Sequence, residues 1–352
     1  GPGAAGPDGA GMYASEASYD TIVSALLTGT AVVTEPEYVY TKHGDRSAIV
    51  AIEPLYNYEP RNQVDTGYAF LTASADSTAQ TWSLEGKIDL ETGAVSIASG
   101  RVFHTYKDEH RQGLTDASLS SDERYLLTAS YDEKGRLWTV GNQQNVRAYL
   151  GAKDRLWAIA AAPNSEYVAA ACNDGRVYFW APMTVEKLFD EDGVGVNIPN
   201  HQDCLRRGEG FEESGHEGAI YDFAFSPNSQ YCATVGRDGT LRLWDVGTSY
   251  QKWLYKQQNR LADVDVSPRE VWTEPAKHAD MIYSVRFSDD GGYILTASRD
   301  KTARIWSAAT GQELCRCIGH TGAVRKAIFL GASVLTASDD GTAKLWDVGN
   351  AA

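Results

Sequence analysis

The chain has few cysteines and no long apolar run, and both shortages exclude classes of protein. Its 352 residues include five cysteines, an odd number at irregular spacings, so we expect no disulfide framework and favour a reducing compartment. No run of eighteen apolar residues occurs, so no transmembrane segment is expected. The opening residues, GPGAAGPDGAGM, lack the basic start and apolar stretch of a secretory signal. These features favour an intracellular, cytoplasmic protein without a membrane partner.

Basic residues are also scarce relative to acidic ones. The sequence has 32 Lys and Arg against 47 Asp and Glu, which gives a formal net charge of −15. A chain with this balance is repelled by nucleic acid and by anionic membranes unless its basic residues gather on one face. We therefore expect no nucleic-acid partner.

One short sequence motif occurs three times in the chain. LTASADSTAQTW occupies residues 71–82, LTASRDKTARIW residues 295–306 and LTASDDGTAKLW residues 335–346. In each copy a Trp follows an Asp by six positions, and the same spacing recurs elsewhere in the chain. The six pairs are Asp76–Trp82, Asp132–Trp138, Asp174–Trp180, Asp238–Trp244, Asp300–Trp306 and Asp340–Trp346. Internal repetition at this level predicts a repeat fold.

A histidine forms a second marker upstream of most of these Asp residues. His110, His216 and His278 precede their Asp by 22 positions, and His320 precedes Asp340 by 20. His43 takes this place at a longer distance in the first copy, and Ala152 replaces it in the third. Short alternating runs such as IYDFAF and YILTAS lie between the markers and end at turn residues, a pattern typical of antiparallel strands. The shorter Trp-to-Trp distances, 40 and 42 residues, match the period of a four-stranded propeller blade.

The repeat resembles the WD-repeat (WD40) β-propeller family over about residues 37–349. The GH pairs at 215–216 and 319–320 and the WD pairs at 244–245 and 346–347 carry this resemblance. It implies an all-β propeller of four-stranded antiparallel blades. It also implies a buried polar network in each blade, in which His contacts Asp and a strand hydroxyl, and the hydroxyl contacts Trp. The sets expected by position are His110–Asp132–Ser130–Trp138, His278–Asp300–Ser298–Trp306, His320–Asp340–Ser338–Trp346 and His43–Asp76–Ser74–Trp82. Cys172 and Gly236 take the hydroxyl position in the other two copies.

Six Trp-bearing repeats favour six blades, with a seventh, irregular or supplied by a partner, as the alternative. We expect residues 1–36 to be a flexible leader, in part a remnant of cloning, with an N-terminal extension. Residues 37–352 are expected to form one propeller, whose ring is closed when the strand EYVYTKH, 37–43, completes the last blade. The insertions at 83–109, 181–215 and 247–277 are expected to be protruding loops.

No catalytic, cofactor or metal site is predicted. The recurring Ser, His and Asp residues belong to the expected buried networks, so they are not expected to act as a nucleophile and its base. GVGVN at 193–197 lacks the third glycine of a dinucleotide loop. CRC at 315–317 supplies two thiols where zinc needs four ligands, and FDEDG at 189–193 misses the calcium-loop spacing.

The resemblance also implies that the rim around the central channel is a surface that binds partners. Two sets of positions lie there: the residue before each turn Asp, and the start of the first strand of each blade. Aromatic residues and Arg, which dominate binding hot spots, are enriched at these positions. The candidates are Tyr131, Arg155, Trp157, Tyr221, Arg237, Met281, Tyr283, Arg299 and Arg325. We expect a non-enzymatic scaffold that binds another protein or peptide, acidic or phosphorylated. A structural subunit of a larger assembly is the alternative, and an enzyme using the channel is less favoured.

Overall fold

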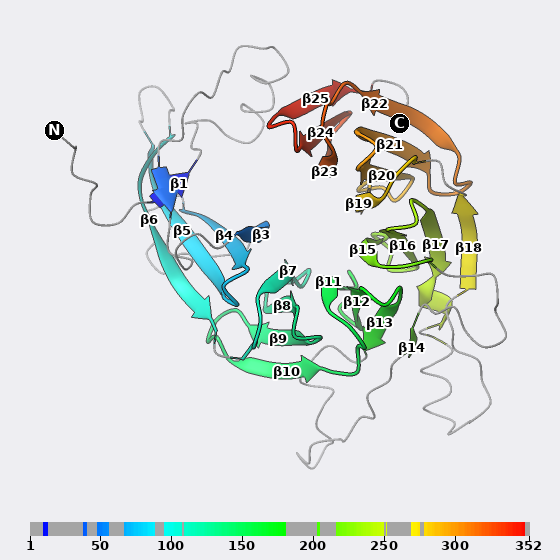
Figure 1. Ribbon diagram of the computed structural model, residues 1–352. Coiled ribbons are helices and arrows are strands. Elements are labelled where there is room, and N and C mark those ends of the chain that lie inside the picture. Colours follow the sequence, from blue (N-terminus) through cyan, green and yellow to red (C-terminus); the bar gives the residue numbers. More distant parts are fainter. Residues whose placement is uncertain are drawn as a thin grey trace.

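The molecule is an arc of β-sheets around a central channel (Figure 1). The computed structural model describes residues 10–12, 38–40, 48–55, 67–88, 95–107, 109–180, 203–204, 216–249, 251, 269–274 and 278–348. Six sheets stand side by side as blades, and the first strand of each lies next to the channel. The all-β architecture of antiparallel blades expected from the sequence is confirmed.

Five blades have four antiparallel strands that follow one another outward from the channel. Blade one contains β3 (Ile49–Leu55), β4 (Gly67–Ser74), β5 (Ala79–Ile88) and β6 (Val95–Tyr106). Blade two contains β7 (Leu114–Leu119), β8 (Tyr125–Ser130), β9 (Gly135–Thr139) and β10 (Asn145–Tyr149). Blade three contains β11 (Leu156–Ala161), β12 (Val168–Cys172), β13 (Val177–Trp180) and β14 (Asp203–Cys204). Blade four contains β15 (Ile220–Phe225), β16 (Tyr231–Gly236), β17 (Leu241–Asp245) and β18 (Arg269–Glu274). Blade five contains β19 (Ile282–Phe287), β20 (Tyr293–Ser298), β21 (Thr302–Ser307) and β22 (Glu313–Ile318).

Blade six has three described strands, β23 (Val324–Leu330), β24 (Ser333–Ser338) and β25 (Ala343–Asp347). The strand expected to complete it lies elsewhere. β2 (Tyr38–Tyr40) pairs antiparallel with β1 (Ala10–Met12) in a separate two-stranded sheet. One edge of β2 is thus paired with β1, and within the described residues β25 pairs only with β24. Pairing of the described residues 38–40 with the last blade is not observed, so closure by residues 37–43 stays a prediction.

The insertion at 83–109 is part of the sheet rather than a protruding loop. β5 continues to Ile88 and β6 begins at Val95, and the two strands pair along their whole shared length. The reason is that extended pairing satisfies the backbone groups that a free loop would leave to water. Most of the insertions at 181–215 and 247–277 lies outside the described residues, as does His43. Their described parts include the outer strands β14 and β18.

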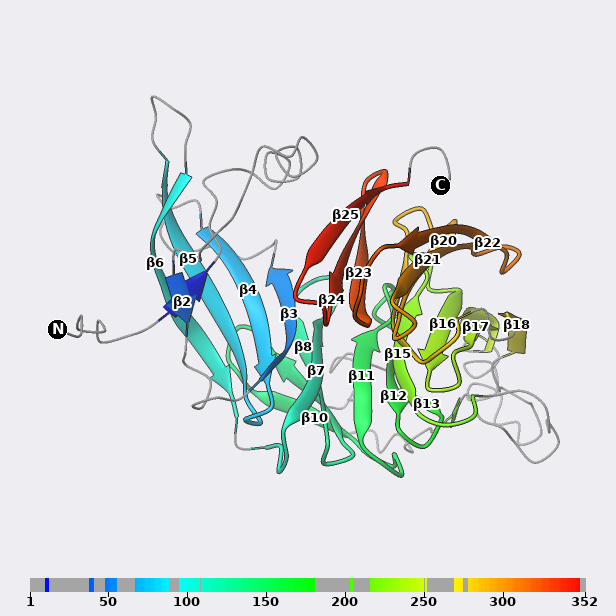
Figure 2. The same cartoon turned by 45° about the horizontal axis from the view of Figure 1, so that its top comes forward.

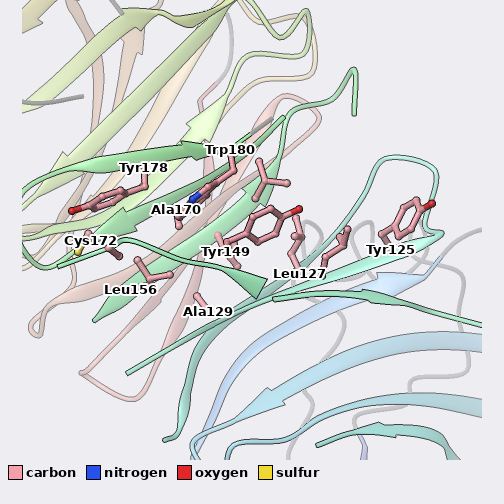
Figure 3. Close-up of a cluster of buried hydrophobic side chains, with 13 residues drawn as sticks. Tyr125, Leu127, Ala129, Tyr149, Leu156, Ala170, Cys172, Tyr178 and Trp180 are labelled. Carbon is pink, nitrogen blue, oxygen red and sulfur yellow. The ribbon is translucent and has the colours of Figure 1, made fainter. Parts of the chain in front are cut away.

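The core lies between blades, because each blade has one apolar face for each neighbour. Leu127, Ala129 and Leu137 of blade two pack against Leu156 and Ile159 of blade three in one buried cluster, part of which Figure 3 shows. The same arrangement joins blade five to blade six, where Leu295, Ala297, Ala303 and Ile305 meet Val324 and Ala327. The alternation of the strands therefore places two sets of apolar side chains on opposite faces of each sheet.

Carboxylates on the channel strands also join neighbouring blades. Glu53 of blade one accepts a hydrogen bond from the backbone N–H of Leu119 in blade two at 2.8 Å. Asp116 of blade two accepts one from Ile159 in blade three at 3.0 Å. Asp222 of blade four accepts one from Val285 in blade five at 3.1 Å. These contacts are referred to below as carboxylate staples.

Candidate functional site

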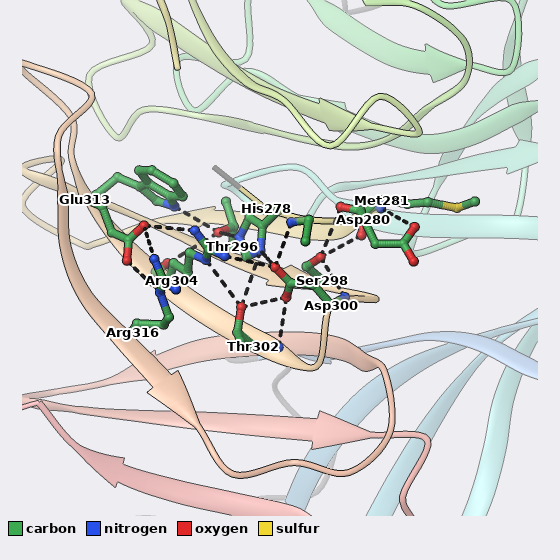
Figure 4. Close-up of polar contacts among 12 residues, drawn as sticks. His278, Asp280, Met281, Thr296, Ser298, Asp300, Thr302, Arg304, Glu313 and Arg316 are labelled. Atoms are coloured by element: carbon green, nitrogen blue, oxygen red, sulfur yellow. Dashed lines mark hydrogen bonds and ion pairs between the residues drawn. The ribbon is translucent and has the colours of Figure 1, made fainter. Parts of the chain in front are cut away.

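A buried polar network stands at one end of each complete repeat, next to the rim. In blade five, His278 Nδ1 lies 2.8 Å from Asp300 Oδ2, and His278 Nε2 lies 2.8 Å from Thr296 Oγ1 (Figure 4). The indole N–H of Trp306 donates to the same Thr296 oxygen at 2.9 Å. Since the ionised Asp300 can only accept, His278 Nδ1–H donates to it, and Nε2 of the neutral ring then accepts the Thr296 hydroxyl. Every member of this chain thus has a partner.

The bridging hydroxyl is a threonine, not the serine expected from the sequence. Blades two, four, five and six use Thr128, Thr234, Thr296 and Thr336, each bound by a His and by a Trp indole. Thr72 accepts the Trp82 indole in blade one. The predicted Ser lies two residues later and has another role. Ser298 Oγ donates to Met281 O at 2.9 Å and accepts the backbone N–H of Asp300, so it shapes the turn. Ser130 does the same in blade two with Gly113 and Asp132.

Blade four is therefore complete, although Gly236 occupies the predicted hydroxyl position. Blade three has lost the network, because Ala152 stands at the His position and Ala170 at the Thr position. There the Tyr178 hydroxyl donates to Asp174 at 2.7 Å, and the Trp180 indole donates to the Leu150 carbonyl at 3.2 Å. Each buried polar group has found a substitute partner, as burial demands.

Hydrogen bonding keeps the turn aspartates ionised. Burial would raise the pKa of Asp300, but the hydrogen bond and charge of His278 and the Thr302 hydroxyl hold this pKa well below its ordinary value. Asp238 has a lowered pKa for the same reasons, with His216 as its partner. Burial in turn lowers the pKa of His278, which agrees with the neutral tautomer inferred from its partners. These groups stabilise the blade and are not available for acid–base chemistry.

The rim is assembled on top of these turns. In every blade the residue before the turn Asp donates its backbone N–H to the loop that enters the first strand. These bonds are Ala75 to Ala48, Tyr131 to Gly113, Asn173 to Arg155, Arg237 to Ala219, Arg299 to Met281 and Asp339 to Ala323. The two predicted sets of rim positions are thus held side by side, at N···O distances between 2.8 and 3.1 Å.

Four aromatic side chains from four consecutive blades form a continuous row on this rim. Tyr131 and Trp157 have ring centroids 5.8 Å apart, Trp157 and Tyr221 5.7 Å, and Tyr221 and Tyr283 5.9 Å. The first two pairs are edge-to-face, the geometry that aromatic pairs prefer. We call Tyr131, Trp157, Tyr221 and Tyr283 the aromatic arc. Met281 joins it, since its Sδ lies 3.7 Å from the Tyr221 hydroxyl.

Arginines flank the aromatic arc and differ in what neutralises them. Arg155 lies over the Trp157 ring at 5.0 Å, and Arg325 lies over the Tyr283 ring at 4.4 Å. Arg325 also binds Asp339 of its own blade through two nitrogens, with the shortest distance 2.7 Å. Arg299 lies 3.7 Å from Asp280, and both side chains are exposed. Arg237 is exposed, and its stem lies against Gly218.

Comparison with known proteins identifies the repeat. The family model described as "WD domain, G-beta repeat" matches residues 100–139, 143–181, 210–245, 270–307 and 311–347. The chain belongs to this WD-repeat family. The five matches fall on blades two to six, and blade one has the same strand order without a match.

Relatives among the WD-repeat proteins are similar over part of this chain. Periodic tryptophan protein 2 of Arabidopsis thaliana is 24% identical over 64% of this chain and 21% of its own length. Transducin beta-like protein 2 of Homo sapiens is 27% identical over 42% of this chain and 30% of its own length. Striatin-4 of Mus musculus is 26% identical over 40% of this chain and 18% of its own length. This WD-repeat chain therefore spans less than a third of each of these three relatives.

Sequence reasoning missed two acidic residues beside the rim, Asp154 and Asp280. Asp154 binds the Asn173 side chain at 2.6 Å, and Asn173 in turn accepts the Trp157 indole N–H at 3.1 Å, which orients that ring. Asp280 stands beside Arg299 in the same way. The signal in the sequence is an Asp in the loop just before the first strand, at 154 and 280.

In the part of the chain that the structure describes, no three His, Cys, Asp or Glu side chains gather as a metal site. Within the same residues, no helix has the length and apolar character needed to cross a membrane.

Proposed function

We propose that this WD-repeat chain is a non-enzymatic scaffold whose rim binds an acidic or phosphorylated segment of another protein. Membership of the family supports a protein-interaction scaffold or assembly subunit in general. The single observation that carries the finer proposal is the aromatic arc, which joins four blades into one surface with Arg155, Arg237 and Arg299 beside it. Large aromatic rings and guanidinium groups bury much area and donate several hydrogen bonds, as binding hot spots do.

Charge supports an anionic ligand. Arg325 already has a carboxylate partner in Asp339, whereas Arg237 and Arg299 are exposed, and the closest Asp to Arg299 stands 3.7 Å away. Guanidinium groups bind carboxylates and phosphates through paired hydrogen bonds, and the aromatic arc offers apolar contact to the segment between them. A peptide with an acidic or phosphorylated side chain on each side of an apolar residue fits this arrangement.

The absence of catalysis is part of the same proposal. The Ser, His and Asp residues that recur in each repeat do not meet as a nucleophile and its base. His278 Nε2 is bound by Thr296, and the Ser298 hydroxyl donates to a backbone carbonyl. A reactive hydroxyl needs a free base and an exposed position.

Charge reversal on the rim tests the proposal. Arg237→Glu combined with Arg299→Glu is expected to weaken binding of an acidic or phosphorylated partner segment at least about a hundredfold, since two charged hydrogen-bonding groups become repulsive. The control is Arg124→Glu combined with Arg269→Glu, which makes the same change of net charge at exposed positions outside the rim sets. Affinity is measured by calorimetry and stability by thermal unfolding. Equal losses in both double variants, or unchanged affinity in the rim variant, would show that the binding surface lies elsewhere.

A second candidate function is a structural subunit of a larger assembly. The observation that favours it is separate from the rim: within the described residues, no strand pairing joins blade six to blade one.

A further inference from the structure

The face of blade six that points away from blade five has no neighbouring blade among the described residues. Blades five and six carry the same phrase, so their side chains compare one to one. In blade five, Leu295 is 1% exposed and Ala297 0%, because blade six covers them. In blade six, the equivalent Leu335 is partly exposed and Ala337 is exposed. Ala343 is exposed and Leu345 is partly exposed, whereas their equivalents in blade five, Ala303 and Ile305, are buried.

The facing side of blade one is uncovered as well. In the other blades, the first and fourth residues of the channel strand are buried against the preceding blade; in blade five Ile282 and Val285 are both 0% exposed. In blade one the same register places Ile49 and Ile52, and these side chains are 50% and 68% exposed. The two apolar surfaces that pack together between neighbouring blades are thus present, one on blade six and one on blade one, and here both are exposed.

The spatial arrangement agrees with this exposure. The channel strands contact one another in the order β3, β7, β11, β15, β19 and β23, and no comparable contact joins β23 to β3. Figure 1 shows blade six, in red, and blade one, in blue, with no described strand between them, and Figure 2 shows the same six blades after rotation. We call the space between β23–β25 and β3–β6 the open sector.

The outer edge of blade six is unfinished too. The Trp residues of the repeats in the five complete blades are at most 3% exposed, whereas Trp346 is partly exposed. In blade five the fourth strand β22 pairs with β21 beside Trp306, and no described strand takes this place beside β25. An edge strand with an open ladder is suited to pair with another strand.

We propose that the open sector is a docking surface for a β-blade supplied by another protein. The two walls decide the chemistry of this partner, because each is one half of an interface that occurs five times in the chain. The inserted element has to be an antiparallel sheet with alternating apolar residues on both faces. One face meets Leu335 and Ala337, and the other meets Ile49 and Ile52.

The N-terminal strands of the chain itself are a poorer fit to the open sector. β1 and β2 pair with each other, and the residues between them, 13–37, are fewer than the roughly 40 that a blade takes. A partner that contributes a whole blade covers both walls at once. Binding at this surface is independent of the rim, since neither wall contains a residue of the aromatic arc.

Cysteine labelling tests whether the open sector is accessible in the full chain. Ile52→Cys is expected to react with a maleimide at least about tenfold faster than Val285→Cys, its counterpart inside an interface, because a buried site reacts only when it opens. Peptide mass spectrometry assigns the label, so the native cysteines do not interfere. Protection of residue 52 in a monomer would mean that the ring closes on itself or is filled by its own N-terminal residues. Protection in a dimer would assign the surface to a second copy. Either result overturns the proposal.

A copy of blade five, which packs between two other blades in this chain, then serves as the probe. A second copy of residues 278–318 is appended to the C-terminus of the full Ile52→Cys chain through a flexible linker. We expect labelling of residue 52 to slow by at least about tenfold and the melting temperature to rise, because apolar surface on both walls is buried. A matched fusion, in which the appended copy carries Val285→Asp and Leu295→Asp, places charge on both of its faces and is expected to give neither effect. If the unaltered copy does not protect residue 52, or if the charged copy protects it equally, the open sector is not a docking surface for a blade.

Discussion

A single hydroxyl in each repeat joins the buried histidine to the buried tryptophan. Thr296 is 0% exposed and is bound by His278 at 2.8 Å and by the Trp306 indole at 2.9 Å. Its neighbour two residues on, Ser298, bonds only to backbone groups of the adjacent loop and turn. Thr296 is therefore hydrogen-bonded to two side chains, whereas Ser298 is hydrogen-bonded to backbone groups.

This difference gives the first prediction. Thr296→Val keeps the shape of the side chain but leaves two buried ring nitrogens without a partner, so it is expected to cost about 2–4 kcal/mol. Ser298→Ala is expected to cost about 1 kcal/mol, because Met281 O also accepts the Arg299 N–H. Urea titrations of both variants measure these costs. Equal losses, or a larger loss for Ser298→Ala, would contradict the assignment of Thr296 as the bridge.

At the scale of the element, the fourth strand decides how much a repeat tryptophan contributes. Trp306 lies under the complete sheet of blade five and is 1% exposed, whereas Trp346 lies in the three-stranded blade six and is partly exposed. Both donate to an equivalent Thr, at 2.9 and 2.8 Å. The pair therefore isolates burial from hydrogen bonding.

We expect Trp306→Ala to lower the free energy of unfolding by about 3–5 kcal/mol and Trp346→Ala by roughly half as much. The smaller cost follows from the apolar area that Trp346 already exposes to water in the folded chain. Guanidinium titration with a common slope gives the comparison. A cost for Trp346→Ala as large as that for Trp306→Ala would mean that the outer side of blade six is covered in solution.

Much of the element level could be predicted from the sequence. The Asp-to-Trp spacing and the alternating runs predicted the blades, because both are local features of a strand and its turn. Local patterns could not separate Thr296 from Ser298, since residues two apart lie on the same face of a strand. They also could not find the partner of Tyr38–Tyr40, because pairing with Ala10–Met12 depends on contacts distant in sequence. The aromatic arc could be predicted because a ring brings equivalent positions of successive repeats together.

At the scale of the whole molecule, the channel holds charges from several blades near one another. Burial raises the pKa of Glu53 to about 7, and burial also raises the pKa of Asp116 to about 6. Burial acts on Asp222 in the same direction, but the charges of Arg286 and Lys326 bring its pKa below the ordinary value. Two carboxyls in the channel thus keep their protons to a higher pH than usual, and a third is held ionised.

The sign of the pH dependence follows from the raised pKa of Glu53. The folded chain binds this proton more tightly than the unfolded chain, whose Glu pKa is near 4.5. The stability that Glu53 contributes is therefore fully present below about pH 4.5 and is lost as the pH rises through about 7. Glu53→Gln is expected to raise the free energy of unfolding at pH 8 by on the order of 1–3 kcal/mol relative to the unmodified chain, and to change it little at pH 4.5.

Urea titrations at pH 4.5, 6, 7 and 8 measure this slope. Asp222→Asn serves as the control and is expected to destabilise at all of these pH values, because it leaves Arg286 without its ion pair at 3.0 Å. A stability difference between Glu53→Gln and the unmodified chain that does not vary with pH would contradict the assigned protonation.

The carboxylate staples are unevenly distributed, and this has a mechanical consequence. Staples join blade one to two, two to three and four to five, but blade three has Ala158 where blades two and four have Asp116 and Asp222. The joint between blades three and four therefore lacks a staple along the channel, although Tyr167 and Asn164 of blade three bond to Ser229 of blade four across it. Where no described strand joins the last blade to the first, a small rotation at one joint displaces every later blade relative to blade one. Blade six is the last of these blades. A rotation at the joint between blades three and four, on the opposite side of the molecule, therefore changes the width of the open sector.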